Sequence, residues 1–306
     1  MRYTQFLHPK FWSSWCMVFL VRLLASLPLR LQQWLGQIAG LLGYCFWTKR
    51  RKIAQTNIGL CFPQLDAKAQ TRLVRATFVS NGIGLLETAT GWFRNPERLR
   101  DITYIHGHEH IEKALSQGRG VILLGGQYST LELGGTLISL FLKNADILQR
   151  AHKNPLYNAV MTRSRRRYYG VLDRKDLRGM LRSLKANRVV WYATDQDNGR
   201  KNSVFAPFFG TPAATLTSTA RIARKTGAAV VPFSHFRRNH GLGYDIYFHE
   251  PLRDFPTDDE ELNATRINQI IEGEIRKHPE QYLWTHRRFK TTPVPHTTNP
   301  YHELND

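Results

Sequence analysis

Two polar side chains that follow an apolar run, Gln127 and Glu132, are the residues of this chain best placed for chemistry. The run at 121–125, Val-Ile-Leu-Leu-Gly, has the length of a buried strand, and a second Gly follows it. Ser129 and Thr130 add further polar groups before Glu132. Buried strands that present polar side chains at their carboxyl end commonly build the active site of α/β enzymes. A plain strand-turn-helix connection, with a Ser or Thr as the helix cap, fits the same residues.

The corner would match a known motif if position 127 were His. It would then read His-x4-Glu, the catalytic motif of glycerolipid and lipid A acyltransferases. The chain resembles one branch of these enzymes, the late lipid A acyltransferases of the lauroyl/palmitoleoyl type, from about His8 to Lys290. The similar segments are Asn-Ile-Gly-Leu-Cys-Phe-Pro at 57–63, Leu-Glu-Thr-Ala-Thr-Gly-Trp-Phe at 86–93, Leu-Asp-Arg-Lys-Asp-Leu-Arg-Gly-Met at 172–180, Val-Trp-Tyr-Ala-Thr-Asp-Gln-Asp at 190–197 and Pro-Glu-Gln-Tyr-Leu-Trp-Thr-His-Arg-Arg-Phe-Lys at 279–290. The last two segments are specific to this branch.

The resemblance implies a base at position 127 and an orienting carboxylate at Glu132. Gln127 departs from it, because an amide cannot take a proton at neutral pH. Loss of a general base typically costs about 10²- to 10⁴-fold in rate. Three explanations stay open: a deliberately inactivated variant, a naturally divergent homologue, or another base. Glu132 is the first candidate for that other base, followed by four histidines, namely His106, His108, His110 and His152.

Arginines and aspartates near other strand ends are the candidate substrate-binding residues. Arg150 aligns with the Arg that begins the family's Arg-x3-Asn-Pro-Leu segment, and it suits a phosphate or carboxylate unless it pairs with a neighbouring carboxylate. Asp195 and Asp197 end a strand and could hold a divalent metal, but no further oxygen ligands accompany them. We therefore predict that they orient Arg side chains or sugar hydroxyls, with no metal.

Two further segments could contact an anionic lipid. Arg200 lies in a turn at 198–203 whose cations suit anionic groups. The aromatic segment at 205–210 would then form an apolar wall for an acyl chain, or ordinary core. Arg287, in the basic-aromatic segment 286–290, would face a phosphate or membrane headgroup, or else end a solvated helix.

The chain is strongly basic, with 43 Lys and Arg against 24 Asp and Glu among 306 residues and a net charge of +19. Such a surplus predicts attraction to nucleic acid, anionic lipid or an acidic protein. The cations are scattered and accompany no zinc-finger or RNA-binding motif, which argues against nucleic acid. Three cysteines, an odd and low count, argue against a disulfide framework and fit a cytoplasmic catalytic portion.

The amino-terminal segment predicts a membrane anchor at 1–48. Residues 11–29 are apolar and nearly long enough to span a bilayer, although Arg22 interrupts them. A second helix is expected at 31–47, and the basic residues 49–52 would keep the remainder of the protein on the cytoplasmic side. The segment either spans the inner membrane once or lies in its cytoplasmic face, and a buried hairpin of a soluble protein is the alternative.

Apolar strand-like runs alternate with helical segments from residue 49 onward. We predict strands at 121–125, 146–150, 189–194, 228–235 and 244–249, and helices at 67–94, 109–117, 131–142, 155–168, 175–186, 215–226 and 258–277. This alternation is typical of an α/β fold with a mostly parallel central sheet flanked by helices, similar to glycerolipid acyltransferases. A Gly-Leu-Gly turn before Tyr244 predicts an antiparallel pair at one edge. The acyltransferase domain would cover 49–290, with a flexible tail at 291–306.

The resemblance implies a bacterial inner-membrane enzyme that moves a fatty acyl group from acyl carrier protein to a hydroxyl of an anionic lipid A precursor. No metal or organic cofactor is expected beyond the donor thioester. Two alternatives remain: a lysophospholipid acyltransferase, which shares His-x4-Glu but not the two branch-specific segments, and a lipid-binding pseudoenzyme weakened by Gln127.

Overall fold

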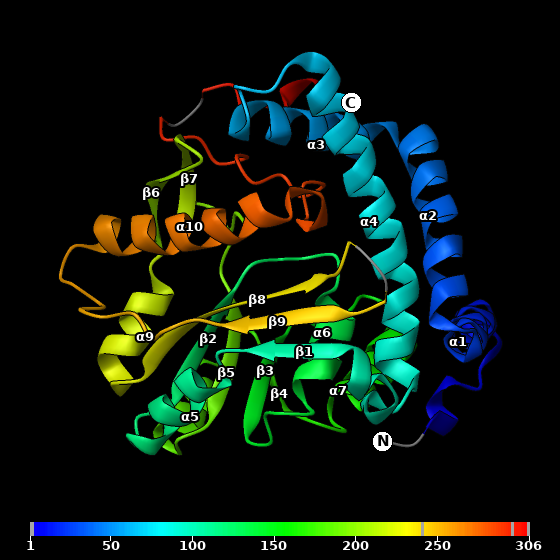
Figure 1. Cartoon of the computed structure of the whole chain (residues 1–306), viewed down its shortest axis with the longest axis horizontal. Helices are drawn as coiled ribbons and strands as arrows, with labels where there is room; N and C mark the ends of the chain where they lie inside the picture. Colours follow the sequence, from blue (N-terminus) through cyan, green and yellow to red (C-terminus); the bar gives the residue numbers. More distant parts are fainter. Residues whose placement is uncertain (1–2, 240–241, 295–296, 305–306) are drawn as a thin grey trace.

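The computed structural model describes residues 3–239, 242–294 and 297–304. Its centre is a seven-stranded sheet of order β1-β9-β8-β2-β5-β3-β4 (Figure 1). The strands are β1 (Thr103–His106), β2 (Val121–Gly125), β3 (Ala145–Gln149), β4 (Gly170–Asp173), β5 (Val189–Ala193), β8 (Ala229–Arg237) and β9 (Tyr244–Phe248), and a separate antiparallel pair is formed by β6 (Ser203–Phe208) and β7 (Thr211–Leu216). The predicted α/β class with a mostly parallel sheet is confirmed.

Ten α-helices within the described ranges pack around the sheet. They are α1 (Trp12–Ser26), α2 (Leu29–Phe46), α3 (Thr48–Cys61), α4 (Ala67–Phe93), α5 (His108–Ser116), α6 (Leu131–Ile138), α7 (Pro155–Arg165), α8 (Leu177–Lys185), α9 (Ser218–Thr226) and α10 (Glu260–Lys277). Short 3₁₀ helices lie at Tyr3–Phe6, Pro9–Phe11, Pro96–Ile102, Pro279–Gln281 and His302–Leu304.

Alternate side chains of β2 face two separate cores, because successive residues of a strand point to opposite faces. Val121 and Leu123 join a cluster with residues of α5 and α6, whereas Ile122 and Leu124 join a cluster with residues of α3, α4, α8, α9 and α10. Both faces of the sheet are therefore covered, which explains why β2 reads as a continuous apolar run.

The predicted strands and the observed ones agree closely, but four strands, β1, β4, β6 and β7, were not predicted. β8, β2, β5, β3 and β4 run parallel, and β9 is antiparallel to β8. We predicted that the antiparallel pair would lie at an edge of the sheet. β1 pairs with β9 and forms that edge instead, so β8 and β9 are the third and second strands of the sheet. The predicted helix at 215–226 begins only at Ser218, because 211–216 pairs with β6. Gly241 of the predicted turn lies outside the described residues.

The parallel strands bring their carboxyl ends to one edge of the sheet. Gln127 follows β2, Arg150 follows β3, and Asp195 follows β5. These three strands are neighbours in the order β2-β5-β3, so residues that are far apart in sequence come together at this edge.

The amino-terminal helices are attached to the body of the protein. α2 lies along α4, and a Cβ at Gly36 would stand 2.5 Å from the Cα of Ile83, so the glycine permits the close approach (Figure 1). Gln32 of α2 is buried and accepts a 2.8 Å hydrogen bond from Thr90. Helix α2 is therefore packed against the body of the protein. In the part of the chain that the structure describes, none of the helices combines the length and apolarity needed to cross a bilayer.

The carboxyl-terminal segment is packed, unlike the flexible tail that the sequence predicted. Tyr301 is fully buried, its hydroxyl contacts Asn57, and it accepts a 3.1 Å hydrogen bond from the amide of Phe289. Tyr301 and Leu304 both belong to the core cluster that includes residues of α3, so the described carboxyl-terminal residues pack against this helix.

Candidate active site

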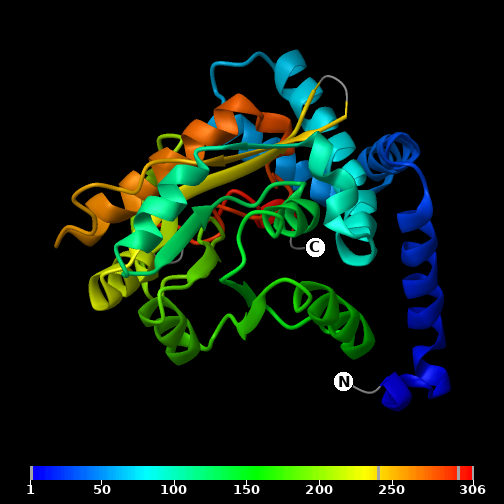
Figure 2. The same cartoon turned by 60° about the horizontal axis from the view of Figure 1, so that its bottom comes forward.

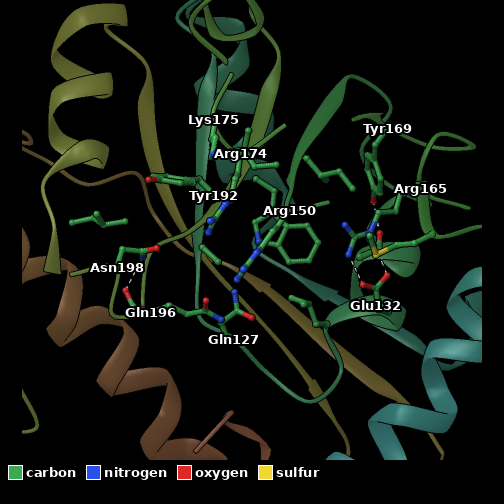
Figure 3. A pocket seen from close by; sticks show the side chains of 18 of the residues that line it. Gln127, Glu132, Arg150, Arg165, Tyr169, Arg174, Lys175, Tyr192, Gln196 and Asn198 are labelled. Carbon is green, nitrogen blue, oxygen red and sulfur yellow. Dashed lines mark hydrogen bonds and ion pairs between the residues drawn. The ribbon is translucent and has the colours of Figure 1, made fainter. Parts of the chain in front are cut away.

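A cavity of about 680 Å³ opens at the carboxyl ends of β2, β5, β3 and β4 (Figure 3). Its apolar lining includes Leu131, Ile147, Leu148, Met161, Trp191 and Leu216, and its polar lining includes Gln127, Glu132, Arg150, Arg165, Arg174, Lys175, Gln196, Asn198, Lys201 and Asn202. Gln127, Glu132 and Arg150 had been predicted from sequence, and the fold brings all three to one cavity.

Two distant segments, one at Asp195 and one at 281–283, hold the main chain around Gln127. Its amide donates a 2.8 Å hydrogen bond to Oδ2 of Asp195, and its carbonyl accepts a 3.0 Å bond from the amide of Leu283. The amide of Ser129 bonds the carbonyl of Gln281 at 2.7 Å, and Tyr128 forms an isolated antiparallel bridge with Tyr282. The turn after β2 is therefore fixed from both sides, which keeps position 127 at the cavity wall.

Glu132 lies in the first turn of α6, and both of its carboxylate oxygens have partners. Trp92 donates its indole N–H at 2.9 Å, and the guanidinium of Arg165 forms an ion pair with the same carboxylate. The Glu132 and Arg165 side chains are 17% and 19% exposed, so the pair is partly shielded from water. In Figure 3 Glu132 lies against Arg165, while Gln127 points toward Arg150. Within the described residues, no hydrogen bond joins Gln127 to Glu132.

This arrangement supplies a held carboxylate but no neutral proton acceptor at position 127. Each oxygen of Glu132 already accepts a hydrogen bond, so the carboxylate is oriented and satisfied. A carboxylate in this state suits the support of a neighbouring cation better than proton abstraction. Trp92 and Arg165 therefore hold the Glu132 carboxylate in one orientation at the cavity wall.

Glycines set α6 close to the sheet. A Cβ at Gly135 would lie 2.8 Å from the Trp191 ring, and one at Gly134 would lie 2.6 Å from Nδ1 of His235. Any side chain at these two positions would push the helix outward and carry Glu132 with it. The Gly pair at 134–135 thus determines how deep Glu132 sits in the cavity.

The polar rim of the cavity is cationic. Arg150, Arg174, Lys175 and Lys201 are exposed at the rim, and Glu132 is the one carboxylate among the described residues that line it. Glu132 is already paired with Arg165. Arg150 makes no ion pair with a described carboxylate, so the alternative that it pairs with a neighbouring carboxylate is not observed. The rim suits a substrate that carries phosphate or carboxylate groups, and the inner wall suits an apolar chain.

The two aspartates predicted to orient substrate bond the main chain instead. Asp195 is buried, and burial raises its pKa. The hydrogen bond that Asp195 accepts from the Gln127 amide acts to lower the same pKa. Asp197 accepts bonds of 2.6 and 2.8 Å from the amide and hydroxyl of Thr291. Neither side chain is part of the cavity lining. Asp195 holds the main chain at Gln127, and Asp197 holds Thr291 of the carboxyl-terminal segment. No cluster of metal ligands occurs among the described residues.

Arg200 and Arg287, which the sequence predicted to bind lipid, do not line the cavity. Arg200 donates to the carbonyls of Thr292 and Pro293, at 2.5 and 3.1 Å. Arg287 donates to the carbonyl of Leu304 at 3.2 Å. Both contact the folded carboxyl-terminal segment, which the sequence had suggested was free. The aromatic segment 205–210 joins the core rather than the cavity wall, since Phe208 and Phe209 are buried there.

The four histidines proposed as alternative bases lie outside the cavity lining. His106 bonds Asp245 at 2.9 Å, and His152 accepts the amide of Asn154 at 3.0 Å. His108 lies near Glu112, and His110 follows it on α5. A different histidine, His235, lies behind the corner and contacts the Thr130 hydroxyl at 2.7 Å. Burial lowers its pKa to about 3, and it does not line the cavity either.

Several residues of the site were not singled out from the sequence. Trp92 lies in the family-like segment 86–93, Arg165 in the basic run 163–167, and Arg174 and Lys175 in the segment 172–180. Their membership in those segments was the available signal. What each of them contacts depends on helices and strands that are adjacent only in the folded chain.

The site joins an α/β sheet, an oriented carboxylate at a strand-to-helix corner and a cavity that has an apolar wall and a cationic rim. This combination suits the transfer of an acyl chain to an anionic acceptor, which is the chemistry of an acyltransferase. The sequence profile of the bacterial lipid A biosynthesis acyltransferases matches residues 1–291, and the chain belongs to that family.

Curated relatives agree with the predicted branch. The chain is 39% identical over 292 residues to the lipid A biosynthesis lauroyltransferase of Escherichia coli K12 and 38% identical over 292 residues to the palmitoleoyltransferase of the same strain, with 95% of both chains covered in each case. It is 26% identical over 302 residues to the lipid A biosynthesis myristoyltransferase of that strain, covering 97% of this chain and 92% of the relative. A solved 1-acyl-sn-glycerophosphate acyltransferase from Thermotoga maritima is 16% identical, with a TM-score of 0.41, covering 83% of this chain and 99% of that one.

Proposed function

We propose that this protein transfers a fatty acyl group from acyl carrier protein to a hydroxyl of an anionic lipid A precursor. The observation that carries the proposal is the pairing of a held carboxylate, Glu132, with a cavity whose rim is cationic and whose wall is apolar. An acceptor with phosphates and acyl chains presents the complementary groups. The activities of two similar curated relatives, lauroyl and palmitoleoyl transfer, support the same substrate class.

The chemistry is the exchange of a thioester for an ester. The acceptor hydroxyl oxygen attacks the thioester carbonyl carbon, the hydroxyl proton leaves to a base, and the carbon–sulfur bond breaks as the carrier thiol departs with a proton. The cavity would have to hold the two reactants together and stabilise the oxyanion, and positioning alone contributes substantially to such reactions. No cofactor beyond the donor thioester is part of the proposal.

Gln127 leaves the proton acceptor of this reaction missing. Its amide can still donate a hydrogen bond to the acceptor hydroxyl or to the developing oxyanion, so we expect slow transfer rather than none. The second candidate function, a lipid-binding pseudoenzyme of the same fold, is favoured by this one substitution. The two differ in whether any acyl group moves.

We further propose that the protein docks on the cytoplasmic face of the inner membrane through α1 and α2. Among the described residues, 17 large apolar side chains are exposed, and 12 of them lie between Leu7 and Trp47. Trp34, Ile38 and Leu42 follow one stripe of α2, opposite the face that packs on α4. Exposed apolar surface of this extent, edged by Trp and followed by cations at 49–52, is typical of interfacial membrane binding.

The direct test is an acyl-transfer assay in detergent micelles with a lauroyl-loaded acyl carrier protein and a tetra-acylated lipid A precursor, followed by mass spectrometry. Transfer by the parent chain, or by Gln127→His, supports the enzyme. If both forms bind the precursor and neither transfers an acyl group, the lipid-binding function replaces it.

A further inference from the structure

A ridge of cations runs along α8 beside the cavity. Arg178, Arg182 and Lys185 stand at helical positions i, i+4 and i+7, so they share one face of α8, and all three are exposed. Arg174 and Lys175, which immediately precede the helix, line the cavity rim. We call these five residues the α8 ridge.

The α8 ridge carries little compensating negative charge. Within the described residues, none of its five side chains has a hydrogen bond or ion pair to a carboxylate. Two aspartates lie close by in sequence, but Asp173 accepts the amide of Lys175 at 2.9 Å and Asp176 accepts the amide of Gly179 at 2.8 Å. Both carboxylates are thus engaged with main-chain amides at the start of the helix. Five adjacent unpaired cations repel one another, so an external anionic partner would stabilise this surface.

The other face of α8 explains why the helix presents its cations outward. Met180 and Leu184 are buried in the core beneath the sheet, and the helix packs against β5 and α9. The burial of one face fixes the orientation of the helix, so the ridge is a rigid surface. Rigid charged surfaces bind a partner with less loss of conformational entropy than flexible charged loops.

The position of the ridge distinguishes a soluble partner from a membrane. In Figure 2 the blue α1 stands on one side of the molecule, whereas the yellow-green α8, beside the yellow α9, lies on the other. The exposed apolar side chains gather on α1 and α2. A membrane bound to that apolar surface would leave α8 facing away from it.

We infer that the α8 ridge is the docking surface for the acidic carrier protein that brings the acyl chain. This inference rests on the proposed function, since it names where the donor binds. An acidic helix of the carrier would lie along Arg178, Arg182 and Lys185, and Arg174 and Lys175 would receive the phosphate of its prosthetic arm. The ridge leads directly into the cavity rim, so an acyl chain on that arm would reach the apolar wall beside Gln127.

The test uses the full-length chain in neutral detergent and the triple charge reversal Arg178→Glu, Arg182→Glu and Lys185→Glu. Binding of a lauroyl-loaded acyl carrier protein is measured by calorimetry at low and at physiological salt. We expect the Kd of the triple variant to rise at least roughly tenfold, and the salt dependence of binding to become weaker, because attraction between exposed charges is screened over about 8 Å at physiological salt.

A matched control has the same change in net charge away from the ridge. Lys68, Lys113 and Lys143 are exposed residues that do not belong to the α8 ridge, and their replacement by Glu should leave the Kd close to that of the parent. A second measurement compares donors in a Gln127→His background. The ridge variant should raise the KM for the carrier-bound donor and leave that for a lauroyl-pantetheine thioester unchanged.

The outcomes separate the inference from the proposed function. If the parent binds the carrier and the ridge variant binds it equally well, the carrier docks elsewhere and the inference is wrong. If the ridge variant loses binding to phosphatidylglycerol vesicles but binds the carrier as the parent does, the inference is also wrong, and the α8 ridge binds the membrane. If the parent transfers acyl groups from lauroyl-pantetheine but does not bind the carrier, the protein is still an acyltransferase. The proposed donor and the proposed docking surface would then both be wrong.

Discussion

The indole Nε1 of Trp92 donates a 2.9 Å hydrogen bond to the carboxylate of Glu132, across 40 positions of the chain. Trp92 lies in the last turn of α4 and Glu132 in the first turn of α6, so this bond joins the long helix that contacts α2 to the helix that carries the cavity carboxylate. Arg165 of α7 completes the support. The orientation of the Glu132 carboxylate therefore depends on three helices at once.

Replacement of Gln127 by His should restore a general base. We expect acyl transfer to rise by about two to four orders of magnitude, the usual contribution of such a base. In that background Glu132→Ala should abolish most of the gain, because an imidazole without its carboxylate is a poorer base. The initial rate with carrier-bound donor measures both effects. An already fast parent chain whose rate does not change with Gln127→His would show that another residue is the base.

The Trp92 bond should matter for the rate rather than for the fold. In the Gln127→His background we expect Trp92→Phe to lower kcat by about ten- to a hundredfold, since a hydrogen bond to a charged group contributes about 1.5–3 kcal/mol. Phe keeps the aromatic contact that Trp92 makes with Tyr157, at 5.0 Å between ring centroids. The thermal midpoint should stay close to that of the parent. An unchanged kcat at equal stability would rule out an orienting role for Trp92.

Membrane docking should depend on the exposed stripe of α2. The triple variant Trp34→Ser, Ile38→Ser and Leu42→Ser should weaken binding to anionic vesicles at least roughly tenfold, because each large apolar side chain contributes about 1.5–3 kcal/mol when buried. The comparison is the exposed triple Tyr104→Ser, Leu262→Ser and Val294→Ser, which lies outside α1 and α2. Equal loss of vesicle co-sedimentation in the two triples would remove the docking surface. Deletion of residues 1–48 is a poorer test, since α2 supports α4.

A buried ion pair should be essential for folding. Two guanidinium nitrogens of Arg237 donate to Glu87, at 2.7 and 2.6 Å, and Tyr244 donates to the same carboxylate at 2.5 Å. Glu87→Ala leaves a buried cation without its partner, which typically costs about 3–5 kcal/mol. Denaturant unfolding should show this loss, and the double variant Glu87→Met, Arg237→Met should recover much of it. A Glu87→Ala loss below about 1 kcal/mol would contradict the role of this pair in holding α4 on the sheet.

His235 should make the protein less stable as the pH falls. Its pKa in the folded protein is lowered to about 3 by burial, so between about pH 6.5 and 4.5 the unfolded chain takes up a proton that the folded chain does not. Unfolding is therefore favoured by acid, by about 2 kcal/mol between pH 7 and pH 5 for one such histidine. His235→Gln should flatten this dependence. The free energy of unfolding is measured in both proteins at each pH.

The pH range chosen for this comparison avoids a second group. The pKa of Glu274 is lowered to about 2: burial acts to raise it, but hydrogen bonds from His249, Lys277 and Ser234 lower it. The ionised Glu274 therefore stabilises the folded protein above about pH 4.5, and this contribution is lost only below that pH. His286, whose pKa burial also lowers, is present in both proteins and cancels in the difference. Parallel curves for the parent and His235→Gln above about pH 4.5 would exclude His235 as the source.

The sequence by itself determined the class of fold, the strand that carries the corner, and the family. Apolar runs of strand length alternating with amphipathic segments are local patterns, so β2, β3, β5, β8 and β9 were predictable. Gln127, Glu132 and Arg150 were predictable for the same reason, since each follows or closely follows such a run. β1 and β4 were missed because four residues give little periodic signal, and the six-residue strands β6 and β7 were missed because 205–210 was interpreted as an aromatic wall and 215–226 as a helix.

Tertiary structure decided the contacts of each polar group. Asp195, Asp197, Arg200 and Arg287 are polar residues in family-like or basic segments, and the sequence could not show that their partners would be main-chain groups at 127, 291–293 and 304. Such partners are distant in sequence and are common to every residue, so no residue pattern identifies them. Trp92 and Arg165 reach Glu132 only because α4, α6 and α7 pack together. The local sequence determines the helix, strand or turn on which a side chain lies, and the packing of the whole chain determines which groups that side chain contacts.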